Sequence, residues 1–333
     1  MSAQPDMYPE RPIEQLPAAL TTIQPGGGVV MGLELWWGKV RRWWLKTFRR
    51  GYVERMTKLR QGDFNPAPHE VLDPRDLKFY RNQSGWYWKP EDDPFTWRDR
   101  IPFARVGLAE LLVFSFLTFG PAKLLAAWLL LAPPSTTVAA FGWFVVVALV
   151  IVGVLLVWFF RDPSRAIPAD PDVIVSPADG KVTKVERLEH DDHIGGPAWE
   201  ISIFLSVFNV HINRVGEAAR VIGMTYTPGK FLDARDLRAA LENERLAIRF
   251  QQTSGPRRPF IIRQIAGLLA RRIVCWVKPG DELKRGEQFG MIKLGSQTQI
   301  VIPWESERDV IVKPGDIVAA GCDIIARYRQ AAN

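Results

Sequence analysis

The sequence predicts a mainly β protein that also carries two membrane-spanning helices and an N-terminal extension. Three observations lead to this fold class. From about residue 161 onward, short runs of alternating apolar and polar residues are interrupted by Gly, Pro and Asp, as in antiparallel strands joined by turns. Residues 105–160 are mostly apolar. The preceding hundred residues are instead rich in Pro, Gly, Trp and basic side chains.

The extension divides into two parts by composition. Residues 1–34 are rich in Pro and Gly and have neither a basic start nor a short apolar core, so we expect disorder and no cleavable signal peptide. Residues 35–104 begin with basic side chains interleaved with Trp and Leu, which favours an amphipathic helix on an anionic membrane surface. A solvated basic helix is the alternative. The net charge of +7 is concentrated in this part, so we expect a membrane and no nucleic acid as partner.

Residues 105–160 predict a transmembrane hairpin. Val138–Phe160 carries no charged residue and is long enough to cross the hydrocarbon layer. The first arm, residues 106–132, is also apolar but contains Glu110 and Lys123, so a re-entrant segment is the alternative to a second span. Basic residues flank both ends of the hairpin, and a full hairpin therefore predicts that both ends and the domain that follows lie on the cytoplasmic side.

A repeated turn supports the β fold after residue 161. Val277–Gly286 recurs as Val312–Gly321, and each copy contains a Pro-Gly turn, a short strand and a second Gly. Paired hairpins of this kind resemble the lipoyl- and biotinyl-type β-sandwich, which is the fold we expect for residues 161–333. Cys275 and Cys322 lie in apolar surroundings without metal-ligand spacing and are expected to be reduced core residues.

Three residues together could supply catalytic chemistry, although each also has an ordinary structural interpretation. His211 lies in an apolar strand-like run, where a histidine is more often a buried hydrogen-bonding residue than a catalyst. Asp179 precedes Gly180 in a typical tight turn. Ser296 follows Gly295, and such a pair inside an apolar strand is typical of a bulge. Together they provide a nucleophile, a base and an acid that can orient the base.

The remaining histidines do not predict a metal site. His190 and His193 lie in an acidic loop with two glycines, residues 189–196, which is typical of a solvated connection between strands. We therefore expect no bound metal.

Six motifs in order along the chain resemble the short prokaryotic form of the phosphatidylserine decarboxylase family. They are Phe159-Phe160-Arg161-Asp162-Pro163, Ser176-Pro177-Ala178-Asp179-Gly180, Phe204-Leu205-Ser206-Val207-Phe208-Asn209-Val210-His211, Asn243-Glu244-Arg245, Gln264-Ile265-Ala266-Gly267 with Ala270-Arg271-Arg272, and Phe289-Gly290-Met291-Ile292-Lys293-Leu294-Gly295-Ser296. The resemblance covers roughly residues 138–327, and the membrane hairpin fits the same family.

The resemblance implies a proenzyme that cleaves itself between Gly295 and Ser296. Its products would be a β chain of residues 1–295 and an α chain of residues 296–333, which remain associated. Ser296 would become a pyruvoyl group, the covalent cofactor that forms a Schiff base with phosphatidylserine and allows its decarboxylation to phosphatidylethanolamine. A homo-oligomer in the cell membrane is also expected.

The family's Asp-His-Ser set corresponds to Asp179, His211 and Ser296. Asp179 would orient His211, and His211 would act first as a base and later as a proton donor. Two differences from the long form of the family concern this set: Gln297 stands where that form has Thr, and Arg214 where it has a second His. His211 is therefore expected to serve both cleavage and decarboxylation, unless Arg214 or a water shares the task.

Two other functions fit part of the sequence. A membrane-anchored lipoyl-like adaptor would use the hairpins for binding alone, although the long heptad repeats usual in such adaptors do not occur here. A membrane serine hydrolase would use Ser296, His211 and Asp179 on an external substrate, and its chain would remain intact.

Overall fold

The structure is a computed structural model of the chain, and it describes residues 8–59, 71–80, 93–170, 172–233, 238–268, 272–293, 295–306 and 309–328. Two compact units divide the chain. The first comprises Met1–Phe95, Arg165–Val207 and His211–Asn333, and the second comprises Thr96–Ser164 and Phe208–Val210.

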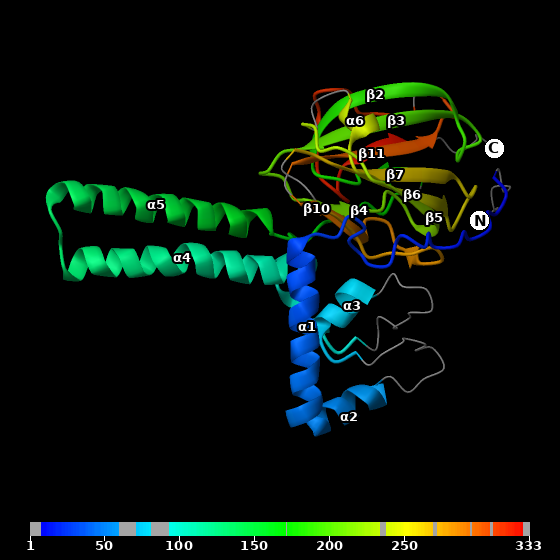
Figure 1. Cartoon of the computed structure of the whole chain (residues 1–333). Helices are drawn as coiled ribbons and strands as arrows, with labels where there is room; N and C mark the ends of the chain where they lie inside the picture. The colour runs from blue at the N-terminus through cyan, green and yellow to red at the C-terminus, as the bar shows by residue number, and fades with distance from the viewer. Residues whose placement is uncertain are drawn as a thin grey trace. The chain divides into compact units, whose positions relative to one another are not determined.

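The second unit is a helical hairpin of α4 (Leu108–Leu131) and α5 (Thr136–Phe159), which lie side by side in Figure 1. Both helices are long and apolar enough to cross a membrane. Small residues let them approach closely, because a Cβ on Gly142 would come within 2.8 Å of the Leu129 side chain. Most of their apolar side chains face outward, and Leu131 is 86% exposed. An apolar exterior of this kind is suited to lipid rather than to water.

The first unit contains the β structure, and every described strand pair is antiparallel. Its largest sheet has eight strands in the order β12-β2-β3-β11-β7-β6-β5-β9. These strands are β2 (Gly180–Asp191), β3 (Gly196–Leu205), β5 (Ala219–Thr227), β6 (Arg245–Gln252), β7 (Pro259–Ala266), β9 (Glu282–Leu283), β11 (Ser296–Pro303) and β12 (Ile317–Val318).

Two smaller sheets complete the β structure. One has the order β4-β10-β8, and the other pairs β1 with β13. Their strands are β1 (Val173–Val175), β4 (Ile212–Arg214), β8 (Arg272–Cys275), β10 (Gln288–Lys293) and β13 (Ile324–Arg327). A single apolar core includes side chains from all three sheets, among them Ile174, Ile292 and Ile300. The predicted mainly β class is thereby confirmed, whereas a lipoyl-like sandwich is not.

The two repeated turns occupy equivalent positions at opposite edges of the eight-stranded sheet. The first copy contains β9 and the second contains β12, which are the two end strands. In each copy an aspartate accepts a hydrogen bond from the lysine amide three residues earlier, at 3.1 Å for Asp281 and 2.9 Å for Asp316. Gly280 and Gly315 have φ angles of 94° and 107°, which explains the glycine in both turns. The repeat therefore encodes an edge strand.

The N-terminal segment differs from the predicted disorder of residues 1–34. Residues 1–7 lie outside the described residues, but Leu20 and Ile23 are buried in the first unit. The segment is also bonded to the sheet by its backbone, since Glu14 N donates to Ile222 O at 2.8 Å. Ion pairs add to this, because Glu14 pairs with Arg249. The prediction of disorder rested on the overall composition of the segment, which does not show that a few individual apolar and acidic residues contact the β domain.

Three helices follow that segment: α1 (Val29–Phe48), α2 (Arg50–Leu59) and α3 (Pro74–Tyr80). They share a small apolar cluster that includes Leu45 of α1 and Met56 of α2. The hydrophobic contacts between these helices therefore do not depend on the β core.

Candidate active site

Ser296 is the first residue of β11, which lies between β3 and β7 in the middle of the large sheet (Figure 1). It pairs with Leu205 on one side and Ala266 on the other. The side chain is fully buried, yet its Oγ has no hydrogen-bond partner in the described part of the chain. A buried hydroxyl without a partner costs about 1–3 kcal/mol, so this position is not explained by stability.

The chain changes sheets immediately before Ser296. β10 ends at Lys293 in the three-stranded sheet, and β11 begins three residues later in the eight-stranded sheet. Gly295 makes the turn with φ 62°, in the left-handed region that a residue with a Cβ adopts only at a cost. The predicted scissile peptide is therefore held at a sharp bend between two rigid strands.

His211 lies beside this bend. It is fully buried and immediately precedes β4, which pairs with β10. The amide of Gly295 donates a hydrogen bond to His211 Nε2 at 3.3 Å, and the amide of Ile292 donates to the His211 carbonyl at 3.2 Å. Because Nε2 accepts in this contact, it carries a lone pair directed at the predicted cleavage site. The structure thus brings two of the three predicted site residues to one junction.

The described partners of the Asp179 carboxylate are groups other than His211. Its carboxylate accepts hydrogen bonds from Arg165 Nη2 at 2.9 and 2.8 Å and from the amide of Ala320 at 2.7 Å. Both side chains of the Arg165–Asp179 ion pair are largely buried. The orienting contact between Asp179 and His211 therefore remains a prediction, and Arg165 is a site residue that the sequence did not indicate.

A chain of buried polar side chains links the strand of His211 to the strand of Ser296. Gln264 Nε2 donates to Asn213 Oδ1 at 2.9 Å, and Asn213 Nδ2 donates to Thr298 Oγ1 at 3.0 Å. All three side chains are fully buried. Asn213 is two residues after His211, and Thr298 is two residues after Ser296, so each shares a strand face with the corresponding site residue. That spacing is the signal by which the sequence could have revealed them.

Asn243 fixes the end of the neighbouring strand. Its side-chain amide donates to the carbonyls of Ala266 and Leu232, at 2.7 and 2.9 Å, and its oxygen accepts from the Leu232 amide at 2.8 Å. Ala266 is the strand partner of Ser296, so Asn243 holds the backbone next to the serine. Burial raises the pKa of the adjacent Glu244 carboxyl.

A groove of about 1130 Å³ lies on the opposite face of the large sheet. Gln297 and Gln299 line it, and they alternate along β11 with Ser296 and Thr298. The groove is therefore separate from the junction of His211 and Ser296. Among the described residues, no group of three or more His, Cys, Asp or Glu side chains is arranged to bind a metal ion.

Fold and site together define a mainly β protein with two potential membrane helices and a buried serine at a sheet junction, where a histidine accepts a hydrogen bond from the amide of the preceding glycine. The family model for phosphatidylserine decarboxylase matches residues 152–326. The chain is also similar to proteins named phosphatidylserine decarboxylase proenzyme. The one from Rhodopirellula baltica is 45% identical over 254 residues, which cover 76% of this chain and 100% of the relative.

Two further relatives with the same name extend this similarity. The protein from Symbiobacterium thermophilum is 49% identical over 175 residues, covering 53% of this chain and 80% of its own length. The protein from Syntrophus aciditrophicus is 39% identical over 230 residues, covering 69% and 95% respectively. The chain belongs to the phosphatidylserine decarboxylase family and is an enzyme of that class.

Proposed function

We propose that this chain is a self-processing enzyme that converts Ser296 into a pyruvoyl group and decarboxylates phosphatidylserine to phosphatidylethanolamine. One observation carries the proposal: His211 Nε2 accepts a hydrogen bond from the amide of Gly295, and the buried hydroxyl of the following Ser296 has no partner among the described residues. The residues present fit a pyruvoyl group at this position, because its precursor serine is already shielded from water and lies beside a base.

His211 would begin the cleavage by removing the proton of Ser296 Oγ. The oxygen then attacks the carbonyl carbon of Gly295, the bond from that carbon to the Ser296 nitrogen breaks, and an ester results. The bend at Gly295 favours this attack because the left-handed φ turns the peptide out of the regular strand path. Elimination of the ester releases residues 1–295 with a new carboxyl terminus, and hydrolysis of the remaining dehydroalanine releases ammonia.

Once formed, the pyruvoyl carbonyl binds the substrate amine and withdraws the electrons left by departing carbon dioxide. The protein side chains have the remaining tasks. His211 would return a proton to the substrate α-carbon, and its burial keeps bulk water from competing for that carbon. Arg214 donates to the carbonyl of Gly286 at 2.9 Å, which favours His211 rather than Arg214 in both proton transfers. Asp179, which is paired with Arg165, would orient His211.

The substrate is a membrane lipid, and the two apolar helices support attachment of the enzyme to a membrane. We propose the bacterial inner membrane with the β domain on the cytoplasmic side, since basic residues flank the hairpin.

A denaturing gel followed by intact mass measurement tests the proposal. We expect two fragments, residues 1–295 and 296–333, and we expect the smaller one to be lighter by one ammonia than a fragment beginning with serine. Ser296→Ala should give a single full-length band and no release of carbon dioxide from phosphatidylserine. Ser202→Ala, a buried serine on the neighbouring strand β3, is the matched control and should be cleaved normally.

The same gel separates the alternatives. A serine hydrolase or a binding adaptor would remain a single chain, and a fragment with a free serine amine would indicate an external protease. Decarboxylation by an uncleaved chain would contradict the pyruvoyl proposal.

A further inference from the structure

The helices before residue 96 lie outside the part of the chain matched by the family model, which begins at residue 152. We propose that α1 is an interfacial helix that docks on the surface of a bilayer containing anionic lipids. This surface would be a second membrane contact, additional to α4 and α5, and it does not depend on the proposed pyruvoyl chemistry.

One face of α1 is an exposed apolar stripe. Its members recur at helical spacing and are between 36% and 80% exposed; they are Val29, Leu33, Trp36, Trp37, Trp43, Trp44 and Phe48. Four tryptophans on one exposed face are unusual for a surface that contacts only water. Tryptophan is the side chain that most favours the boundary between lipid headgroups and acyl chains.

Positive charge borders this stripe. The exposed basic side chains of α1 and of the two residues that follow it are Lys39, Arg41, Lys46, Arg49 and Arg50. The only acidic residue in α1 is Glu34, which is buried. The Arg41 guanidinium lies 5.0 Å from the ring centroid of Trp44, so cationic and aromatic groups share one surface. An apolar stripe with cations at its borders is complementary to an anionic bilayer surface.

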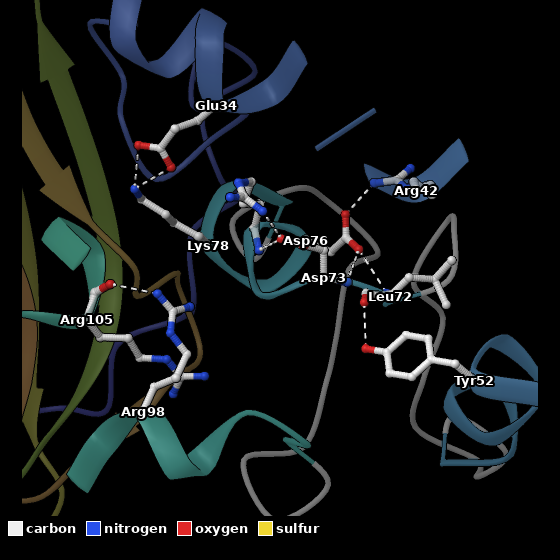
Figure 2. A network of polar contacts seen from close by, with 10 residues as sticks. Glu34, Arg42, Tyr52, Leu72, Asp73, Asp76, Lys78, Arg98 and Arg105 are labelled. Atoms are coloured by element: carbon white, nitrogen blue, oxygen red, sulfur yellow. Dashed lines mark hydrogen bonds and ion pairs between the residues drawn. The ribbon is translucent and has the colours of Figure 1, made fainter. Parts of the chain in front are cut away.

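The opposite face of α1 is held by α3 and its preceding loop (Figure 2). Glu34 accepts two hydrogen bonds from Lys78 Nζ at 2.9 and 2.8 Å, and both side chains are buried. Arg42 pairs with Asp76, and Asp76 also accepts hydrogen bonds from the amides of Leu72 and Asp73. The inner face is therefore already occupied by specific contacts.

These contacts determine which residues α1 presents outward. A rotation of the helix that buried the tryptophans would break the Glu34–Lys78 and Arg42–Asp76 pairs, and breaking a buried pair is strongly unfavourable. The stripe consequently stays available for a partner. Among partners, the charge complementarity and the tryptophan content favour a lipid surface over a second protein.

Site-directed spin labelling of the full-length chain in vesicles tests this inference. Single cysteines replace Leu33, Trp36 and Trp43 in a Cys275→Ala, Cys322→Ser background, and a label at Ile317 on the edge strand β12 is the control. The vesicles contain phosphatidylcholine alone or phosphatidylcholine mixed with phosphatidylglycerol, an anionic lipid that is not the substrate. The readout is the ratio of collision with oxygen to collision with a water-soluble nickel chelate.

We expect the ratio at the three α1 sites to rise several-fold in the anionic vesicles and to return toward its original value at high salt, while Ile317 does not change. Combining Lys39→Glu, Arg41→Glu and Lys46→Glu should abolish the rise, whereas Lys284→Glu with Lys313→Glu should leave it intact. Nickel access that is unchanged by anionic lipid would overturn the proposal. Protection already present in detergent, together with a doubled mass, would instead assign the stripe to a second copy of the chain and would also overturn it.

Discussion

The two ends of β11 both carry buried polar clusters, but the clusters are of different kinds. Near Ser296 the buried side chains of Asn213, Thr298 and Gln264 form a chain of neutral hydrogen bonds. At the far end, beyond Pro303, charges dominate. Arg258 binds Glu305 through two hydrogen bonds of 2.7 and 2.9 Å and lies 3.8 Å from the ring centroid of Tyr328.

The two ends differ in the charge of their hydrogen-bonded side chains, and the proposed chemistry lies at the neutral end. In the charged cluster the Arg258–Glu305 pair is closed by two hydrogen bonds, and Tyr328 also donates to the Pro303 carbonyl at 3.0 Å. In the neutral cluster two groups have no hydrogen-bond partner among the described residues, the Ser296 hydroxyl and Gln264 Oε1. Neutral neighbours also allow the local charge to change during a reaction without repelling a fixed ion.

The largest effect is expected at the charged end and should concern stability alone. Arg258→Met leaves Glu305 without its partner, and removal of one member of a buried pair costs about 3–5 kcal/mol. Unfolding by denaturant in detergent measures this loss, and cleavage at Gly295 should proceed normally in the folded fraction. Arg220→Met, which breaks the more exposed pair with Glu282, is the control and should cost at most about 1 kcal/mol. A slow cleavage in Arg258→Met would show that the two ends are coupled.

The next effect is expected at the neutral end and should concern the rate of cleavage. Asn213→Ala leaves Thr298 and Gln264 without a shared partner and loosens the link between the strands of His211 and Ser296. We expect cleavage to slow by about ten- to a hundredfold, because an unsatisfied buried group costs about 1–3 kcal/mol. A pulse of cell-free synthesis followed on gels gives the rate.

Gln299→Ala is the matched control for that variant. Gln299 lies on the other face of β11 and donates to Ser202 Oγ at 3.1 Å, so the substitution removes a similar buried amide. Cleavage at the parent rate is expected in Gln299→Ala. Equal slowing in both variants would mean that general loosening of the sheet, not the Asn213 link, limits the reaction.

The bend at Gly295 offers a smaller effect. Gly295→Ala brings a Cβ into open space but into the left-handed region, at a cost of about 1–2 kcal/mol, so cleavage should slow by roughly 5–30-fold. Gly315→Ala is the control, because a Cβ there also meets open space and the φ of Gly315 is 107°. It should lower the stability of the protein without changing the cleavage rate. Unchanged cleavage in Gly295→Ala would remove the bend from the mechanism.

A separate effect concerns the pH dependence of stability and a carboxyl near the charged cluster. Burial raises the pKa of Glu217 from 4.5 to about 8, so the folded protein retains a proton that the unfolded chain releases. Stability is therefore lost as the pH rises from about 4.5 to about 8. Glu217→Gln should remove this loss, so it should raise the melting temperature substantially at pH 8 and leave it unchanged near pH 4. A shift of equal size at both pH values would contradict the assignment.

The sequence predicted the types of element better than their pairing. Alternating runs indicated the strands, and the uncharged segment indicated α5, because both signals are local. The order of the sheet is not local: β11 pairs with β3 and β7, which are distant in sequence, and nothing in the single strand specifies those neighbours. The N-terminal segment was missed because Leu20 and Ile23 act as isolated anchors without a periodic pattern.

The candidate site was predicted in a similar way. Ser296 and His211 were proposed because their chemistry is distinctive and the motifs around them resemble a known family, and the structure places them at one junction. Asn213 and Thr298 were missed because a polar residue in an alternating strand usually faces water, and only the packing of β4 against β11 makes these positions buried. Arg165 was missed because the local sequence gives no sign of its contact with Asp179.

The central position of β11 affects how the protein would refold after cleavage. A cut before Ser296 divides the polypeptide inside a sheet whose middle strand then belongs to the smaller product, hydrogen-bonded on both sides. Folding of the intact precursor is a unimolecular process, whereas refolding of the cut protein requires two separate chains to meet, so its rate should fall on dilution. After cleavage the protein would no longer be able to refold as a single chain. Its stability would therefore depend on a slow rate of unfolding rather than on efficient refolding.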